Sequence, residues 1–103
     1  MFGKLNRLSK DELLTVMKSG RSVHHRLFSL KILEARSGPS KFAFVAPKKE
    51  CGESVSRNRA KRRARAAMRK VRLKGPVCCV VLIKRALIKE KFADIVSVFE
   101  AFL

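Results

Sequence analysis

The segment from Arg57 to Lys74 constrains the fold more than any other part of the chain. Almost every position in it is apolar or basic, and none is acidic. Its main apolar residues recur every three or four positions, which is the spacing of one face of an α-helix. Alanine permits close approach of a helix to its neighbour, so we expect this stripe to pack tightly on a sheet and the arginines to face outward. The stripe consists of Ala60, Ala64, Ala67, Met68 and Val71.

The charge of the whole chain indicates a polyanionic partner. There are 25 Lys and Arg against 8 Asp and Glu, a net charge of +17 that would repel itself without a partner of opposite sign. Arginine dominates within Arg57–Lys74, and its planar fork can hold two phosphate oxygens at once. A nucleic acid is therefore favoured. The alternatives are a solvated face without a ligand, an acidic protein, and an anionic membrane surface, where bulky apolar residues are more usual than alanine.

Helices are also predicted near both ends of the chain. Ser9 and Glu12 have the spacing of a capping box, which predicts a helix from Lys10 to Lys18. Gly20 would end that helix as a left-handed cap. Apolar residues at helical spacing predict a final amphipathic helix; they are Phe92, Ile95, Val96, Phe99, Phe102 and Leu103.

Three segments have the patterns of β-strands. Phe28–Ile32 alternates apolar and polar residues, and Lys41–Ala46 is rich in apolar and aromatic residues. Turn residues between them predict an antiparallel hairpin. Val77–Ile83 is apolar throughout, as expected of a strand buried on both faces. Lys48–Ser56 is polar and predicts a loop, from which Ser54 or Ser56 would cap the basic helix.

These elements predict an α+β fold of two layers. At 103 residues the chain can build one core, so we expect a single RNA-binding domain spanning residues 1–103. The sheet would be small and mostly antiparallel, with helices on one face. The strand, helix and strand between Lys41 and Lys84 would form a βαβ crossover.

Several classes of protein are not favoured. The longest apolar run, Val77–Ile83, is far shorter than the roughly 20 residues of a membrane span. The first residues show no apolar stretch of a secretory signal. Cys51, Cys78 and Cys79 form no C-x-x-C pair, which suits reduced thiols and disfavours a zinc site. We therefore expect a cytoplasmic protein without a metal site or membrane contact.

The sequence also does not favour catalysis by the protein itself. Metal-assisted cleavage of a phosphodiester needs converging carboxylates, and the eight acids show no paired motif. His24 and His25 could be the acid and base of a metal-free ribonuclease. Adjacent residues on an extended segment point to opposite faces, however, so simple RNA contact or an ordinary surface role is favoured for them.

The basic helix resembles the RNR signature of the bacterial ribonuclease P protein family. An R-N-R at residues 57–59 is followed at once by x-K-R-x-x-R, with two lysines upstream at a strand end. The resemblance extends over most of the chain and includes residues 18–23 and Arg26-x-Phe28. It implies a left-handed crossover, similar to that of a small ribosomal-protein domain. It also implies that the motif contacts the catalytic RNA of the enzyme. The matching residues are Arg57, Asn58, Arg59, Lys61, Arg62 and Arg65, with Lys48 and Lys49.

The resemblance further implies a groove between the first helix and the first strand for the single-stranded 5′ leader of precursor tRNA. Family members commonly carry aromatic residues there, on which bases can stack. The corresponding positions in this chain are Leu13, Met17, Phe28 and Lys31. Leader contact would therefore depend more on apolar packing and charge than on stacking.

Taken as a family member, the chain is expected to be the accessory protein subunit of ribonuclease P. It would bind the catalytic RNA and the leader, and so assist endonucleolytic removal of the leader. The catalytic centre and its Mg²⁺ ions would belong to the RNA subunit and the substrate, and no protein partner would be required. The alternative is a ribosomal or other architectural RNA-binding protein without nuclease association.

Overall fold

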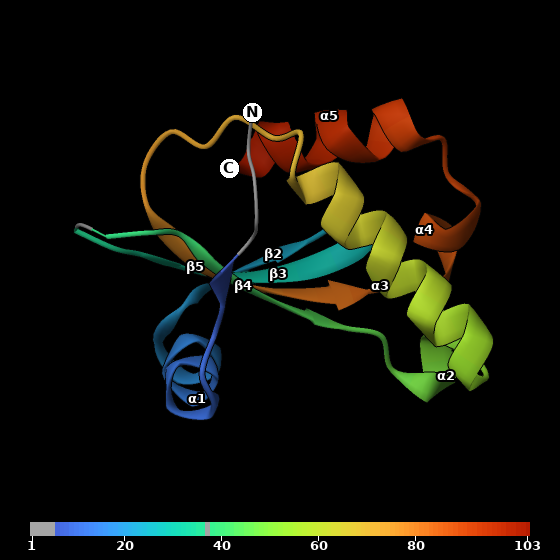
Figure 1. The fold of residues 1–103 in the computed structure, drawn as a ribbon, viewed down its shortest axis with the longest axis horizontal. Coiled ribbons are helices and arrows are strands. Elements are labelled where there is room, and N and C mark those ends of the chain that lie inside the picture. Colours follow the sequence, from blue (N-terminus) through green and yellow to red (C-terminus); the bar gives the residue numbers. More distant parts are fainter. Residues whose placement is uncertain (1–5, 37) are drawn as a thin grey trace.

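The computed structural model describes residues 6–36 and 38–103 (Figure 1). The segments predicted as helices and strands are confirmed, whereas β1, β2, α2 and α4 were not predicted. The strands are β1 (Asn6–Arg7), β2 (Arg21–His24), β3 (Phe28–Glu34), β4 (Lys41–Val45) and β5 (Val77–Ile83). The helices are α1 (Lys10–Ser19), α2 (Lys48–Cys51), α3 (Ser54–Met68), α4 (Arg85–Lys89) and α5 (Phe92–Phe102).

The strands form one mixed sheet in the order β1-β4-β5-β3-β2. β3 is antiparallel to β2 and β5, whereas β4 is parallel to β1 and β5. The predicted hairpin between β3 and β4 is therefore wrong. More of the paired residues are antiparallel than parallel, as predicted, but the sheet is mixed. β5 lies between these two strands because all of its side chains are apolar, which favours the centre of a covered sheet. β4, α3 and β5 form the predicted βαβ crossover.

Helices cover both faces of the sheet (Figure 1). α3, α4 and α5 lie on one face, and α1 packs on the other, against β3 and β5. Cys79 and Val81 of β5 belong to the large core under α3 and α5, whereas Val80 joins a small cluster with Leu8 and Val16. The α+β class is confirmed, but the prediction of helices on one face is wrong for α1. Both faces of β5 are apolar, so helices must bury the sheet on both sides.

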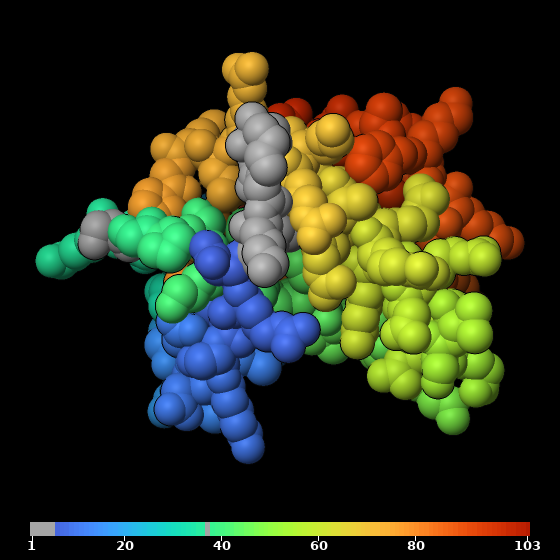
Figure 2. All heavy atoms as spheres, viewed as in Figure 1, coloured from blue at the N-terminus to red at the C-terminus, as the bar shows by residue number. Residues whose placement is uncertain are grey.

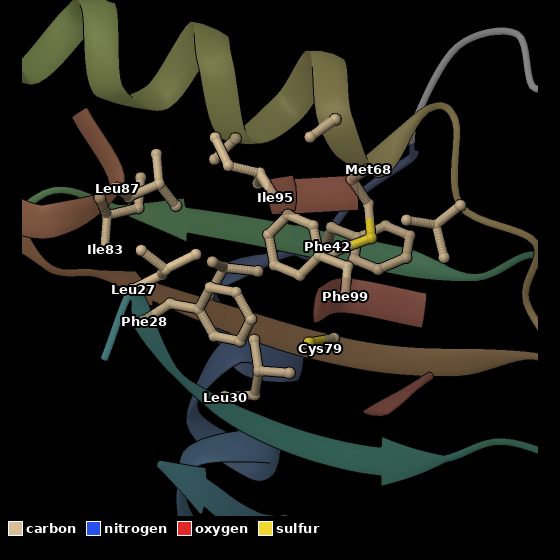
Figure 3. Packing of buried hydrophobic residues seen from close by; sticks show 14 of the residues in the cluster. Leu27, Phe28, Leu30, Phe42, Met68, Cys79, Ile83, Leu87, Ile95 and Phe99 are labelled. Carbon is tan, nitrogen blue, oxygen red and sulfur yellow. The ribbon is translucent and has the colours of Figure 1, made fainter. Parts of the chain in front are cut away.

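The large core joins stacked rings to the alanine stripe of α3 (Figure 3). Phe28 of β3 and Phe99 of α5 are fully buried, and their ring centroids lie 4.5 Å apart. Ala60, Ala64 and Ala67 have no exposed surface. The predicted inward orientation of the stripe is therefore confirmed.

α1 begins as predicted and ends differently. The Glu12 amide donates to Ser9 Oγ at 3.2 Å, and the Ser9 amide donates to the Glu12 carboxylate at 2.8 Å. Gly20 is not left-handed, because its φ is −71° and its ψ is 151°. Glycine is required there for another reason, since a Cβ would lie 2.6 Å from the carbonyl oxygen of Val16. Where the chain passes from α1 into β2, position 20 therefore has no room for a side chain.

Candidate RNA-binding surface

α3 presents basic side chains on the side opposite its alanine stripe. Arg59 and Arg62 are exposed, while Lys61 and Arg65 are half-buried. A shallow hollow of about 550 Å³ lies on this side of the helix, and it is lined by Val55, Asn58, Lys61, Arg62 and Arg65. Figure 2 shows the yellow-green side chains of α3 standing out from the molecular surface. We call this surface the outer face of α3. The helix ends at Met68, earlier than predicted.

The start of α3 is held by an arginine and not by a serine cap. Glu53 occupies the N-cap position and makes no side-chain capping bond, so the predicted caps Ser54 and Ser56 are wrong. Instead, Arg57 Nε donates to the carbonyl oxygen of Ala46 at 2.9 Å, which ties the first turn to the end of β4. Arg57 therefore has a structural role in addition to the RNA contact predicted for it.

Two exposed lysines extend the basic surface from α3 to α2. Lys48 and Lys49 begin α2, within the segment predicted as a loop, and α2 contacts α3. The neighbouring Glu50 turns to α4, where its carboxylate accepts from the Arg85 amide at 3.2 Å. The carboxylate of Glu50 is therefore bonded to α4.

The acids that form ion pairs are paired with cations outside α3. Lys41 lowers the pKa of Glu12 to about 2 through a hydrogen bond, and Arg26 lowers the pKa of Glu90 in the same way. Both carboxylates are therefore ionised at neutral pH. Within the described residues, no ion pair involves a cation of α3. The pairs are Arg21–Glu34, Arg26–Glu90 and Lys41–Glu12, with N···O distances of 3.6, 2.5 and 2.6 Å.

The residues predicted to line a leader groove do not share one face of the sheet. Phe28 is fully buried in the large core (Figure 3) and cannot contact RNA, so its assignment is wrong. Lys31 lies on the opposite face, where α1 brings half-buried Leu13 and Met17, whose exposed fraction is 39%. Strand alternation is the signal that detects this error, because positions 28 and 31 point to opposite faces.

The two histidines make local hydrogen bonds where β2 turns into β3. His24 Nδ1 lies 3.1 Å from Ser29 Oγ, and His25 Nδ1 accepts from the Leu27 amide at 3.1 Å. The cysteines are free thiols, and burial raises the pKa of Cys79 to about 12. In residues 6–36 and 38–103, no three His, Cys, Asp or Glu side chains gather as metal ligands. No helix in that part of the chain is long and apolar enough to cross a membrane.

Two residues that the sequence analysis did not single out join the basic side chains of α3. Arg7 of β1 and Phe44 of β4 line a cavity together with Lys61 and Arg65. β1 has only two residues, too few for a periodic pattern, and Phe44 has the pattern of an ordinary strand residue. Their proximity to α3 depends on strand order.

Comparison with known sequences gives two matches over most of the chain. The family model described as Ribonuclease P matches residues 2–103. The "Ribonuclease P protein component" of Symbiobacterium thermophilum is 34% identical over 84 residues, which cover 79% of this chain and 72% of the relative.

Solved structures share the fold. The RNase P protein from Thermotoga maritima superposes with a TM-score of 0.76 at 21% identity, covering 97% of this chain and 94% of that protein. The Staphylococcus aureus RNase P protein gives a TM-score of 0.75 at 20% identity, with 95% and 92% covered. The mixed sheet with helices on both faces is thus an arrangement that these proteins share with the present chain.

Proposed function

The chain belongs to the ribonuclease P protein family, and from that membership we propose how it serves the enzyme. It is a protein component of ribonuclease P, with an RNA-binding role in maturation of the tRNA 5′ end. We propose that residues 1–103 act as one cytoplasmic RNA-binding domain and that the outer face of α3 binds the catalytic RNA. The contacting residues would be Arg57, Asn58, Arg59, Lys61, Arg62 and Arg65, with Lys48 and Lys49 of α2.

The unbalanced charge of α3 carries this proposal. Its alanine stripe is buried, so the helix cannot rotate to hide its arginines. Within the described residues, the carboxylates that form ion pairs are bound to cations on other elements. A rigid helix that presents arginines without acidic partners suits phosphate groups, which accept two N–H bonds from one guanidinium.

We infer that catalysis belongs to the RNA subunit. A protein that cleaves phosphodiesters with metal ions needs carboxylates that converge. Glu12, Glu34 and Glu90 instead lie in separate ion pairs on different elements. The Mg²⁺ ions would be held by the RNA subunit and the substrate. The cations of this chain would reduce the repulsion between the two RNAs and position the substrate.

Cleavage of precursor tRNA tests the proposed function. At low Mg²⁺, a bacterial ribonuclease P RNA alone should cleave slowly. The protein should accelerate release of the 5′ leader, because its cations replace part of the screening of phosphate charges that Mg²⁺ would provide. The protein without RNA should leave the precursor intact. Cleavage by the protein alone would place the chemistry on this chain, and a lack of stimulation would remove its role as an accessory subunit.

We also propose that the sheet face covered by α1 binds the single-stranded leader of precursor tRNA, at the side chains that α1 leaves partly exposed. Leu13 and Met17 of α1 lie on this face with Lys31 of β3 and with half-buried Val45 and Leu82. Apolar side chains would pack against bases, and the ammonium group of Lys31 would approach phosphates. This pairing of apolar and cationic groups suits a flexible strand of any sequence.

Replacing Met17 with Phe should tighten binding of leader-bearing precursor about two- to tenfold, because a ring gives bases a surface for stacking. Since Met17 is 39% exposed, the larger side chain need not enter the core. The affinities of the reconstituted holoenzyme for precursor tRNA and for mature tRNA measure the effect. The control, Thr15→Phe, places the same ring at an exposed position elsewhere on α1. A lower melting temperature with unchanged affinity for both RNAs would contradict the groove.

A further inference from the structure

A cavity of about 310 Å³ separates α3 from the β1–β4 edge of the sheet. In Figure 2, the yellow-green atoms of α3 and the blue atoms of β1 lie on the same face of the molecule, with green atoms between them. Three described lining side chains are cationic and none is acidic, so the cavity attracts an anion. The described lining consists of Asn6, Arg7, Leu8, Phe42, Ala43, Phe44, Lys61 and Arg65.

Phe44 and Arg65 form a preformed pair in this cavity. The guanidinium carbon of Arg65 lies 5.5 Å from the centroid of the Phe44 ring, within the range of a cation–π contact. The Phe44 ring is in turn supported by buried Phe42, with centroids 6.2 Å apart. These contacts hold the arginine in a defined position. The pair thus offers a flat, cationic surface next to Arg7 and Lys61.

We propose that this cavity binds one unpaired nucleotide of RNA, with its base stacked on the Phe44–Arg65 pair and its phosphate held by Arg7 and Lys61. The proposal rests on the RNA-binding function proposed for α3 and adds a defined subsite to it. Protein rings and guanidinium planes stack on bases that are free of a duplex, because paired bases hide their faces. The volume is at the lower limit of small-ligand pockets, which suits one nucleotide and excludes a double helix.

Phe44→Leu tests the ring without removing charge. Affinity for a bacterial ribonuclease P RNA should fall about tenfold, because the stacking surface is lost. The slope of log affinity against log salt should stay unchanged, whereas Arg65→Ala should lower it by about one. Phe44→Tyr keeps a ring and should keep the affinity. Melting temperatures close to that of the parent protein will show that Phe44→Leu acts on binding and not on folding.

A double-mutant cycle tests whether Phe44 acts through Arg65. Once Arg65 is alanine, adding Phe44→Leu should cause little further loss, because the two residues form one surface. Fully additive losses would overturn the paired subsite. Arg62→Ala, which changes the outer face of α3 but not this cavity, separates the two proposals. If Arg62→Ala weakens RNA binding while Phe44→Leu weakens binding neither to ribonuclease P RNA nor to leader-bearing precursor tRNA, α3 binds RNA and the subsite is wrong.

The unpaired nucleotide can come from the catalytic RNA or from the leader, and two assays distinguish these sources. Weaker binding of Phe44→Leu to ribonuclease P RNA alone would assign the nucleotide to the catalytic RNA. Unchanged binding there, with weaker binding of leader-bearing precursor but not mature tRNA to the holoenzyme, would assign it to the leader. Parental affinity in both assays would overturn the proposal.

Discussion

Ala64→Arg should unfold the protein or lower its melting temperature by about 15 °C or more. Ala64 has no exposed surface and belongs to the core between α3 and the sheet. Arginine would overfill that contact and bury an unpaired charge, which together cost about 4 kcal/mol or more. A domain of this size is stable by only about 5 to 15 kcal/mol, and each kcal/mol shifts the melting temperature by about 4–8 °C. Thermal unfolding followed by circular dichroism measures the loss.

Ala93→Arg is the matched control for this prediction. It makes the same substitution on a helix, at an exposed position of α5, and should leave the melting temperature nearly unchanged. Equal melting temperatures for Ala64→Arg and the parent protein would mean that the alanine stripe of α3 does not face the sheet. The orientation of the basic residues would then have to be reversed as well.

The double variant Arg59→Ala/Arg62→Ala should bind the catalytic RNA roughly 30-fold more weakly or worse. Each side chain is exposed on the outer face of α3, and each loses charge-assisted contacts with phosphate, for a combined cost of about 2 kcal/mol or more. The loss of two phosphate contacts should also reduce the slope of log affinity against log salt concentration by about two. Because neither side chain is buried, the melting temperature should not change. Filter binding over a range of salt concentrations measures both quantities.

Lys89→Ala/Lys91→Ala controls for the general loss of positive charge. Both lysines are exposed at the end of α4 and just before α5, and neither lines the hollow on the outer face of α3. This variant has the same net charge as the arginine double variant. If both weaken RNA binding equally, the effect belongs to the total charge of the chain, and α3 is not a specific binding surface.

Signals between residues close together in the chain predicted much of the fold. Ser9 and Glu12 are three residues apart, and the capping box they predicted is present. The alanine spacing in α3 predicted its buried side, because one helix turn relates these positions directly. The same spacing predicted that Arg59 and Arg62 would be exposed. The candidate RNA-binding surface was thus largely visible in one local pattern.

Tertiary structure alone decided which local elements meet. The residue pattern of a strand does not identify the strands that pair with it, so β5 was not predicted to lie between β3 and β4. A capped amphipathic helix can cover either face of a sheet, and only the burial of both faces of β5 placed α1 opposite α3. The cavity beside α3 has the same origin. Arg7 and Phe44 meet Arg65 because β4 pairs with the short β1 and lies beneath α3, and such contacts depend on hydrogen bonds and packing between distant segments.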